Sequence, residues 1–286
     1  MSVSGVEVGG LTSEPARARL RRAFIRPLEF AHEGKRWQAP PHRFGAHWWV
    51  NGAISRALKA RQGKSVELGV SYWQKKVDRY VDMLARRFFV APQDATLAGL
   101  SGDGRPLITP ERSGRRLAKS LLGGAIAHAL HTPTRAPLRL PMKPVPATRT
   151  QANFGAVIVI ARESKRLTLY DETDPVRGFP VATGQASYPT PLGTWSIATM
   201  QRDPWWIPPP DSDWAQGAKP IPPGPGNPLG TRWMGLTAPL VGIHGTPDSE
   251  SIGYSASHGC IRMHIPDADW LFEQVDIGTP VVIVAA

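Results

Sequence analysis

The chain has 286 residues, 41% of them hydrophobic and 20% charged, and its formal net charge is +11. This composition fits a soluble globular protein, and the length suffices for two domains of ordinary size. No apolar run approaches the roughly 20 residues that a membrane-spanning helix needs, and the single cysteine excludes an internal disulfide.

The positive charge is concentrated in the first half of the chain. Residues 1–150 carry 26 Lys and Arg against 10 Asp and Glu, a net charge of +16, whereas residues 151–286 carry 8 against 13, a net charge of −5. This break predicts two domains with different partners. A basic domain could bind nucleic acid, an anionic membrane surface or an anionic wall polymer. A solvated basic surface without a partner is the alternative.

The first half contains three segments with helical periodicity. Residues 12–24 predict a helix, because its apolar residues recur at four-residue spacing. These residues are Ala16, Leu20 and Phe24. Residues 71–89 predict a second helix, capped by Ser71, and residues 115–130 predict a third. The apolar face expected for the second helix consists of Trp73, Val77, Val81, Leu84 and Phe88.

Short strand candidates lie between these helices. They fall within residues 5–10, 27–39 and 136–145, and the second of them turns at Glu33 and Gly34. We therefore expect a mixed α+β domain. Residues 140–152 contain three prolines and little apolar content, which predicts a linker.

From Phe154 on, short β-rich runs alternate with glycine and proline. Residues 155–171 predict a hairpin, and residues 266–275 predict the one good helix of this half. Further strands are expected within residues 179–185, 193–200, 233–236, 240–246 and 279–286. This spacing is typical of a β-sandwich or barrel.

One proline-rich segment interrupts the strands. Residues 204–228 hold nine prolines and three tryptophans, which predicts a long, stiff loop, because proline lacks the backbone donor that a central strand needs. The tryptophans are Trp205, Trp206 and Trp214. They either stack on sugar or peptide as part of a substrate-covering flap or pack the loop onto the strands.

The one cysteine lies in GYSASHGCIRM, residues 253–263. A thiol is a strong nucleophile only as the thiolate, so Cys260 needs a base. His258 lies two residues before it, and His244 lies 16 residues before it at the end of an apolar strand. A loop that returns to the neighbouring strand would place His244 beside Cys260. The N–H groups of Gly259 and Cys260 could form an oxyanion hole.

Three other interpretations use the same residues. Cys260 could be a small buried apolar residue with the histidines as satisfied polar groups. A zinc site would use His244, His258, Cys260 and His264, although their spacing is loose. A serine hydrolase would use Ser255 or Ser257, although the segment lacks the second glycine of the nucleophile elbow.

The segment HGTPDSESIGYSASHGCIRM, from His244 to Met263, closely resembles the catalytic motif of the L,D-transpeptidases. The resemblance extends over YPTPLGTWSI, NPLGTRWMGL and GTPVVIV, and covers roughly residues 153–286. The first half resembles, more loosely, the peptidoglycan-binding domains that precede such catalytic domains, in GVEVGGLTSEPARARL, APQDA and LITPERSGRRL. The expected division is an α+β peptidoglycan-binding domain over 1–147 and a mostly-β YkuD-type catalytic domain over 148–286, a β-sandwich with one helix.

The resemblance implies a reaction on the stem peptides of peptidoglycan. The thiolate attacks the carbonyl of the third residue, a diamino acid, releases D-alanine and forms a thioester. An amine of a second stem then resolves the thioester to give a 3-3 cross-link. An L,D-carboxypeptidase that uses water is the alternative within enzymes, and a non-catalytic peptidoglycan-binding protein is the alternative outside them.

The resemblance also implies a role for each matching residue. Cys260 is the nucleophile, His244 the base and Gly245 the carbonyl that orients His244, while Gly259 and Cys260 stabilise the oxyanion. Arg262 is placed to meet a substrate carboxylate, or else pairs with Asp248 or Glu250. Substrate contacts are expected from Ser257, His258, Arg262, Tyr254 and Trp233.

The partners follow from the same resemblance. We expect peptidoglycan stem peptides and glycan as substrates and carbapenem-type β-lactams as inhibitors. No cofactor, metal or nucleic acid is expected. The location implied is extracytoplasmic, in the wall or the periplasmic space, with any signal or membrane anchor outside this chain.

Overall fold

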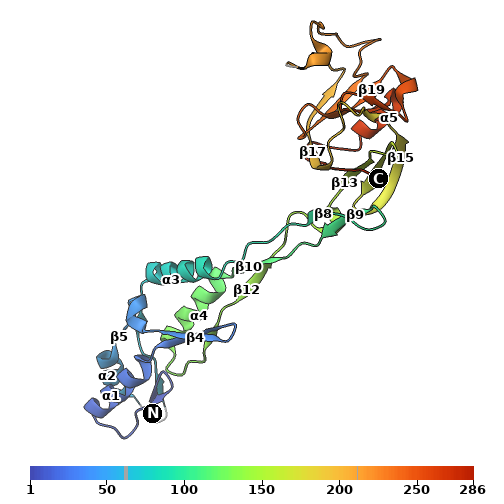
Figure 1. The fold of residues 1–286 in the computed structure, drawn as a ribbon. Coiled ribbons are helices and arrows are strands. Elements are labelled where there is room, and N and C mark those ends of the chain that lie inside the picture. The colour runs from blue at the N-terminus through green and yellow to red at the C-terminus, as the bar shows by residue number, and fades with distance from the viewer. Residues whose placement is uncertain (61–63, 211) are drawn as a thin grey trace. The chain divides into compact units, whose positions relative to one another are not determined.

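The computed structural model describes residues 1–60, 64–210 and 212–286. The chain forms two compact units (Figure 1), and each is built from two stretches of sequence. The first unit comprises residues 1–93 and 113–146, and the second comprises residues 94–112 and 147–286. The predicted fold classes are confirmed: helices and short strands make up the first unit, and a sheet with one α-helix makes up the second.

One core of the first unit lies between two helices and a small sheet. Helix α1 (Ser13–Phe24) buries Ala16, Leu20 and Phe24, as predicted. It packs against α2 (Val50–Lys59), which the sequence analysis did not predict although its buried residues follow the helical pattern. These residues are Val50, Ala53, Ile54 and Ala57. Strands β1 (Ser2–Val3), β2 (Val6–Glu7) and β6 (Ser65–Val66) complete this layer.

A second core of the first unit lies between α3 (Gln74–Arg87), α4 (Lys119–His131) and a three-stranded sheet. The sheet consists of β11 (Leu138–Arg139), β3 (Leu28–His32) and β4 (Lys35–Ala39). The hairpin β3–β4 turns at Glu33 and Gly34, both with positive φ, as predicted. The other elements are the 3₁₀ helix Pro41–Phe44, β5 (His47–Trp48), β7 (Val70–Ser71), β10 (Gly114–Leu117) and β12 (Met142–Val145).

Several predictions for the first unit are wrong in part. Residues 115–117, expected at the start of the third helix, belong to β10, and Ser71, expected to cap the second helix, lies in β7. Trp73 is the N-cap of α3 and is exposed, so it does not belong to the buried face of that helix. The expected linker contains β12, which pairs with β10 along four residues. The strand candidate expected within residues 136–145 contains both β11 and β12, so residues 142–145 follow that prediction and not the linker. The expected domain boundary after residue 147 stays a prediction, but residues 94–112 cluster with the second unit.

An eight-stranded sheet forms the frame of the second unit. Its order is β15-β14-β13-β22-β17-β18-β19-β21. The strands are β13 (Ala156–Ala161), β14 (Arg166–Asp171), β15 (Asp174–Pro180), β17 (Gly193–Arg202), β18 (Arg232–Leu236), β19 (Gly242–Thr246), β21 (Ile261–His264) and β22 (Pro280–Val284). The hairpin predicted over 155–171 is β13–β14.

The sheet turns at β17. Residues 193–196 of this strand pair with β22, and residues 197–202 pair with β18 after a bulge. Side chains from both halves of the sheet meet in one core, which α5 (Ile265–Phe272) closes. The two halves thus pack on each other in the manner of a sandwich. None of the helices in the described residues is both long and apolar enough to cross a membrane.

A hairpin from residues 94–112 covers the other face of β13. Strands β8 (Thr96–Leu100) and β9 (Pro106–Thr109) bring Ile108 and Ala95 against Phe154, Val157 and Val159. Residues 156–161 are therefore apolar on both faces of the strand, which explains the unbroken run AVIVIA.

This packing gives a test of the second unit. Ile108 is 6% exposed, whereas Leu107, its neighbour on β9, is 50% exposed. Ile108→Ala should lower the free energy of unfolding of the second unit by about 2–5 kcal/mol, because it leaves a cavity against β13. Leu107→Ala should change it by less than about 0.5 kcal/mol. Hydrogen exchange of the β13 amides measures both, and equal protection in the two variants would contradict this arrangement.

Candidate active site

Three neighbouring strands present one polar face. Trp233 on β18 lies opposite His244 on β19, and His244 lies opposite Arg262 on the parallel strand β21. Cys260 directly precedes β21 at the position that continues this register to Gly242. Because side chains alternate between faces, these residues share one side of the sheet. The other side holds the fully buried Met234, Ile243, Ile261 and Met263.

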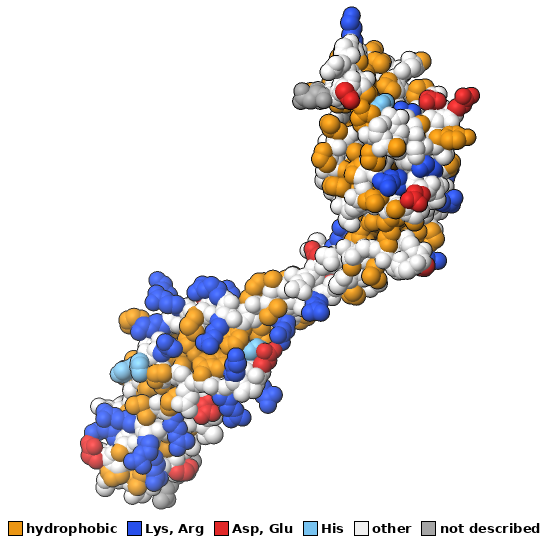
Figure 2. All heavy atoms as spheres, in the orientation of Figure 1, with side chains coloured by type: hydrophobic (Ala, Val, Ile, Leu, Met, Phe, Trp, Pro, Cys, Tyr) orange, Lys and Arg blue, Asp and Glu red, His pale blue; other side chains and the backbone are white. Residues whose placement is uncertain are grey.

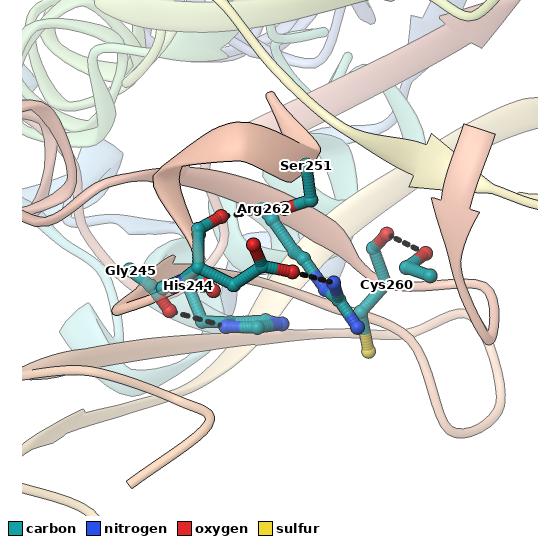
Figure 3. A network of polar contacts seen from close by, with 8 residues as sticks. His244, Gly245, Ser251, Cys260 and Arg262 are labelled. Atoms are coloured by element: carbon teal, nitrogen blue, oxygen red, sulfur yellow. Dashed lines mark hydrogen bonds and ion pairs between the residues drawn. The ribbon is translucent and has the colours of Figure 1, made fainter. Parts of the chain in front are cut away.

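The orientation of His244 is set by the residue that follows it. Nδ1 of His244 lies 2.6 Å from the carbonyl oxygen of Gly245. A carbonyl only accepts, so Nδ1 donates and Nε2 of the neutral ring is left as the basic nitrogen. Figure 3 shows the imidazole extending toward the side of the site on which the sulfur of Cys260 lies. The predicted orientation by a carbonyl is present in the geometry.

Burial keeps both groups neutral at rest. His244 is 4% exposed, and burial lowers its pKa to about 4, with a further lowering by Arg262 and an opposing effect of the Gly245 hydrogen bond. Burial also raises the pKa of the Cys260 thiol, against smaller lowering effects of the Gly242 backbone and Arg262. The thiol has an acceptor in the Leu240 carbonyl oxygen, 3.7 Å from Sγ. At neutral pH the resting site therefore holds a thiol and an uncharged imidazole.

Hydrogen bonds fix the turn before Cys260. The Ser257 hydroxyl donates to the Cys260 carbonyl oxygen at 2.6 Å and accepts from the Gly259 N–H at 3.2 Å. The buried Thr190 hydroxyl donates to the Gly259 carbonyl oxygen at 2.9 Å and accepts from the Gly184 N–H at 2.8 Å. The Gly259–Cys260 peptide is trans, so the Cys260 N–H points away from Thr190. Gly259 has φ +110°, a conformation that favours glycine.

These contacts refine two sequence predictions. The Gly259 N–H, expected to stabilise an oxyanion, donates to the Ser257 hydroxyl in this structure. The Cys260 N–H points away from Thr190, because the Thr190 hydroxyl holds the carbonyl at the other side of the same peptide. Ser257, considered as a nucleophile, gives its proton to a backbone carbonyl. Its geometry is that of a residue that shapes the turn around Cys260.

Arg262 makes the ion pair that was the alternative to substrate binding. Its backbone exchanges two hydrogen bonds with Ala182, and its guanidinium lies 3.4 Å from Asp248. Asp248 is more than half exposed, which limits the strength of this pair. Arg262 also lies beside His244 in the strand register and disfavours its protonation.

His258 is held by the proline-rich loop. Its ring stacks on Trp214 with centroids 4.1 Å apart and an interplanar angle of 9°, and Tyr188 lies 5.0 Å away. The Tyr188 hydroxyl donates to Asp213 at 2.6 Å, which lowers the pKa of the Asp213 carboxyl. Trp214 and Asp213 belong to the 3₁₀ helix Asp213–Ala215 in the segment expected as a loop. Residue 211 of that segment lies outside the described residues.

The remaining predicted residues differ in position. The Trp233 indole lies across β19, where a Cβ at Gly242 would come within 2.4 Å of it, and its ring is 5.9 Å from that of His244. Tyr254 is 67% exposed in the loop before Cys260. His264 ends β21. Within residues 1–60, 64–210 and 212–286, no three His, Cys, Asp or Glu side chains are grouped to hold a metal ion.

Sequence reasoning missed the residues that reach this site from elsewhere. Thr190 and Tyr188 belong to YPTPLGTWSI, and Asp213 lies between prolines. Strand β16 (Thr183–Gly184) brings the first two close because it pairs in parallel with β20 (Ser255–Ser257). Only the similarity of YPTPLGTWSI to the family pattern pointed to this segment.

Comparisons with known proteins find matches for both halves of the chain. Residues 155–283 match the family model of the L,D-transpeptidase catalytic domain, and residues 49–137 match a model described as "Putative peptidoglycan binding domain". The chain is 37% identical over 134 residues to "Putative L,D-transpeptidase YqjB" of Bacillus subtilis, which covers 44% of this chain and 69% of that protein. It is 32% identical over 139 residues to "Putative L,D-transpeptidase YkuD" of Bacillus licheniformis, 49% of this chain and 72% of that protein.

A solved structure is similar over nearly the whole length. A mutant L,D-transpeptidase of Enterococcus faecium is 17% identical, with 96% of this chain and 100% of that chain covered and a TM-score of 0.41.

The neutral resting site predicts how the thiol reacts. Because Cys260 is the only cysteine, alkylation of the whole protein reports this thiol alone. The pKa of Cys260 is raised, so its thiolate fraction at pH 7 is below that of a free thiol. The rate of modification by iodoacetamide should keep rising with pH through and beyond about 8.5, the ordinary thiol pKa. A rate that is already constant near pH 6 would indicate a thiolate–imidazolium pair and contradict this description.

Proposed function

The chain belongs to the L,D-transpeptidase family. We propose that tetrapeptide stems of peptidoglycan acylate Cys260 and that the protein then forms 3-3 cross-links between stems. The observation that supports this most is the position of His244. Its Nδ1 is hydrogen-bonded to the Gly245 carbonyl oxygen, and the residue lies on the strand that neighbours the Cys260 segment. Nε2 is therefore the nitrogen that can take the thiol proton.

The first step joins proton transfer to attack. Since both groups are neutral at rest, Nε2 of His244 takes the proton of Sγ as the sulfur bonds to the carbonyl carbon of the third stem residue. The electron pair of that carbonyl moves to its oxygen, to which the Cys260 N–H, directed away from Thr190, can donate. Gly259 joins as a second donor if Ser257 releases its N–H.

The second step expels D-alanine. The imidazolium of His244 gives its proton to the leaving nitrogen, the C–N bond breaks and a thioester to Cys260 remains. Burial that lowers the pKa of His244 makes this imidazolium a strong acid, which suits a poor leaving amine. The amine of a second stem then attacks the thioester carbonyl, Nε2 of His244 takes a proton from that amine, and the C–S bond breaks. His244 returns the proton to the sulfur, which restores the thiol.

Substrate recognition is assigned to the residues around this centre. Arg262 exchanges its exposed partner Asp248 for a stem carboxylate, for which its planar fork is suited. Trp233 forms a wall beside His244, and His258 and Tyr254 contact the incoming stem from the loop before Cys260. Trp214, stacked on His258, joins the proline-rich loop to this surface as a cover.

The first unit is assigned to wall binding, consistent with the peptidoglycan-binding model that residues 49–137 match. Figure 2 shows Lys and Arg side chains spread over this unit, in line with the +16 net charge of residues 1–150. We place the enzyme outside the cytoplasm, where its substrate is assembled. The β-lactam ring of a carbapenem is strained, and we expect the same thiol to attack its carbonyl, open the ring and become acylated.

Loss of the thiol tests the reaction. Full-length protein incubated with a defined tetrapeptide stem fragment should yield a cross-linked dimer by mass spectrometry. Cys260→Ala and Cys260→Ser should lose more than about a thousandfold in rate while keeping the fold. A carbapenem should add its mass to the wild type and not to Cys260→Ala.

The products separate the candidate functions. A tripeptide without dimer would indicate an L,D-carboxypeptidase, for which water replaces the amine. No change in the stem would indicate a binding protein. Turnover by Cys260→Ala close to that of the wild type would remove Cys260 from the mechanism.

A second prediction concerns the contact between the loop and His258. Tyr188→Phe removes the hydroxyl that bonds to Asp213 at 2.6 Å. We expect KM for the stem to rise about three- to tenfold with little change in kcat, because the solvent-exposed hydrogen bond from this hydroxyl to the Asp213 carboxylate helps to hold the cover. Ile207→Ala, on a 60% exposed residue of the same loop, is the control. Equal effects of the two variants, or a fall in kcat alone, would contradict a covering role.

A further inference from the structure

Two exposed tryptophans share one face of a ribbon in the first unit. Strands β5 and β7 pair antiparallel, with His47 opposite Ser71 and Trp48 opposite Val70. Trp48 and Val70 pack into the core between α1 and α2. Because side chains alternate, the outer face carries His47, Ser71 and the residues two positions beyond each, Trp49 and Trp73.

Glycine lies beneath each indole. A Cβ on Gly69 would come within 3.0 Å of the Trp49 ring, and a Cβ on Gly45 would come within 3.0 Å of the Trp73 ring. The rings therefore lie on bare backbone. Trp49 is nevertheless 53% exposed and Trp73 64% exposed. Both rings therefore present apolar surface to solvent that the core of the unit does not bury.

The two rings are spaced along the ribbon with polar groups between them. Trp49 lies four positions after Gly45, the residue on which the Trp73 ring lies, and four steps correspond to about 13 Å at about 3.3 Å per residue. His47 and Ser71 lie between the rings and offer donors and acceptors. The ammonium of Lys76 lies 4.4 Å from the Trp73 ring centroid and adds a positive charge at that end.

We propose that this tryptophan strip, formed by Trp49, His47, Ser71 and Trp73, binds the glycan strand of peptidoglycan. The proposal rests on the proposed function and names the ligand surface for it. Pyranose rings present apolar C–H faces that stack on indoles, and their hydroxyl and acetamido groups bond to polar side chains between them. The spacing of the indoles spans a few sugar rings. Lys76 is complementary to the carboxylates that the wall polymer carries.

The test uses full-length protein and peptide-free glycan strands, prepared from sacculi by amidase digestion. Trp49→Ala and Trp73→Ala should each weaken cosedimentation affinity about tenfold, and the double variant should abolish binding. Trp49→Phe and Trp73→Phe should retain part of it, since a smaller aromatic face remains. Phe89→Ala, on an aromatic residue of the same unit that is 52% exposed, is the matched control and should bind like the wild type.

The outcomes are independent of the chemistry at Cys260. Turnover of the short soluble stem should be unchanged in all five strip variants, and a wild type that binds glycan but leaves the stem intact would contradict the proposed function alone. Full glycan binding by the double alanine variant would overturn the tryptophan strip. So would an equal loss in Phe89→Ala, or a loss confined to sacculi that retain their peptides, since the ligand would then be the stem.

Discussion

The parallel pairing of β19 with β21 is the constraint on which the site depends. It aligns His244 with Arg262 and leaves Cys260 directly before β21. Parallel neighbours need a crossover of a dozen or more residues, and residues 247–260 supply it together with the turn that carries Cys260. A shift of the register by one residue would turn the face of Ile243 and Ile261 toward the substrate. The apolar packing beneath the sheet thus enforces the geometry above it.

Burial shifts the pKa values of Cys260 and His244 in opposite directions, and both shifts suit the proposed reaction, which begins with an uncharged pair. It raises the pKa of Cys260 and lowers that of His244. A cysteine that rests as the neutral thiol is less susceptible to oxidation than one that rests as the thiolate. In the proposed mechanism charge forms during the attack, and the hydrogen bonds of Ser257 and Thr190 that are already in place fix the backbone around Cys260 for it.

The sequence predicted what local patterns determine. The spacing of His244 and Cys260, the apolar face of α1 and the hairpin β13–β14 could all be read from it. It did not predict contacts between distant segments, such as Thr190 with Gly259, because periodicity identifies a face but not what covers it. Trp73 shows the same limit: four-residue spacing placed it with Val77 and Val81, but it precedes the first helical turn and points outward.

The place of β22 in the sheet has a consequence for how the protein is made. This strand lies between β13 and β17, more than a hundred residues after its parallel partner β13 in sequence. Until residues 280–284 have been synthesised, β13 and β17 have no strand between them and their apolar side chains have no shared core. The catalytic unit therefore cannot assemble progressively from its N-terminal side during translation. The apolar core that β13 and β17 share is therefore completed only by the last strand of the unit.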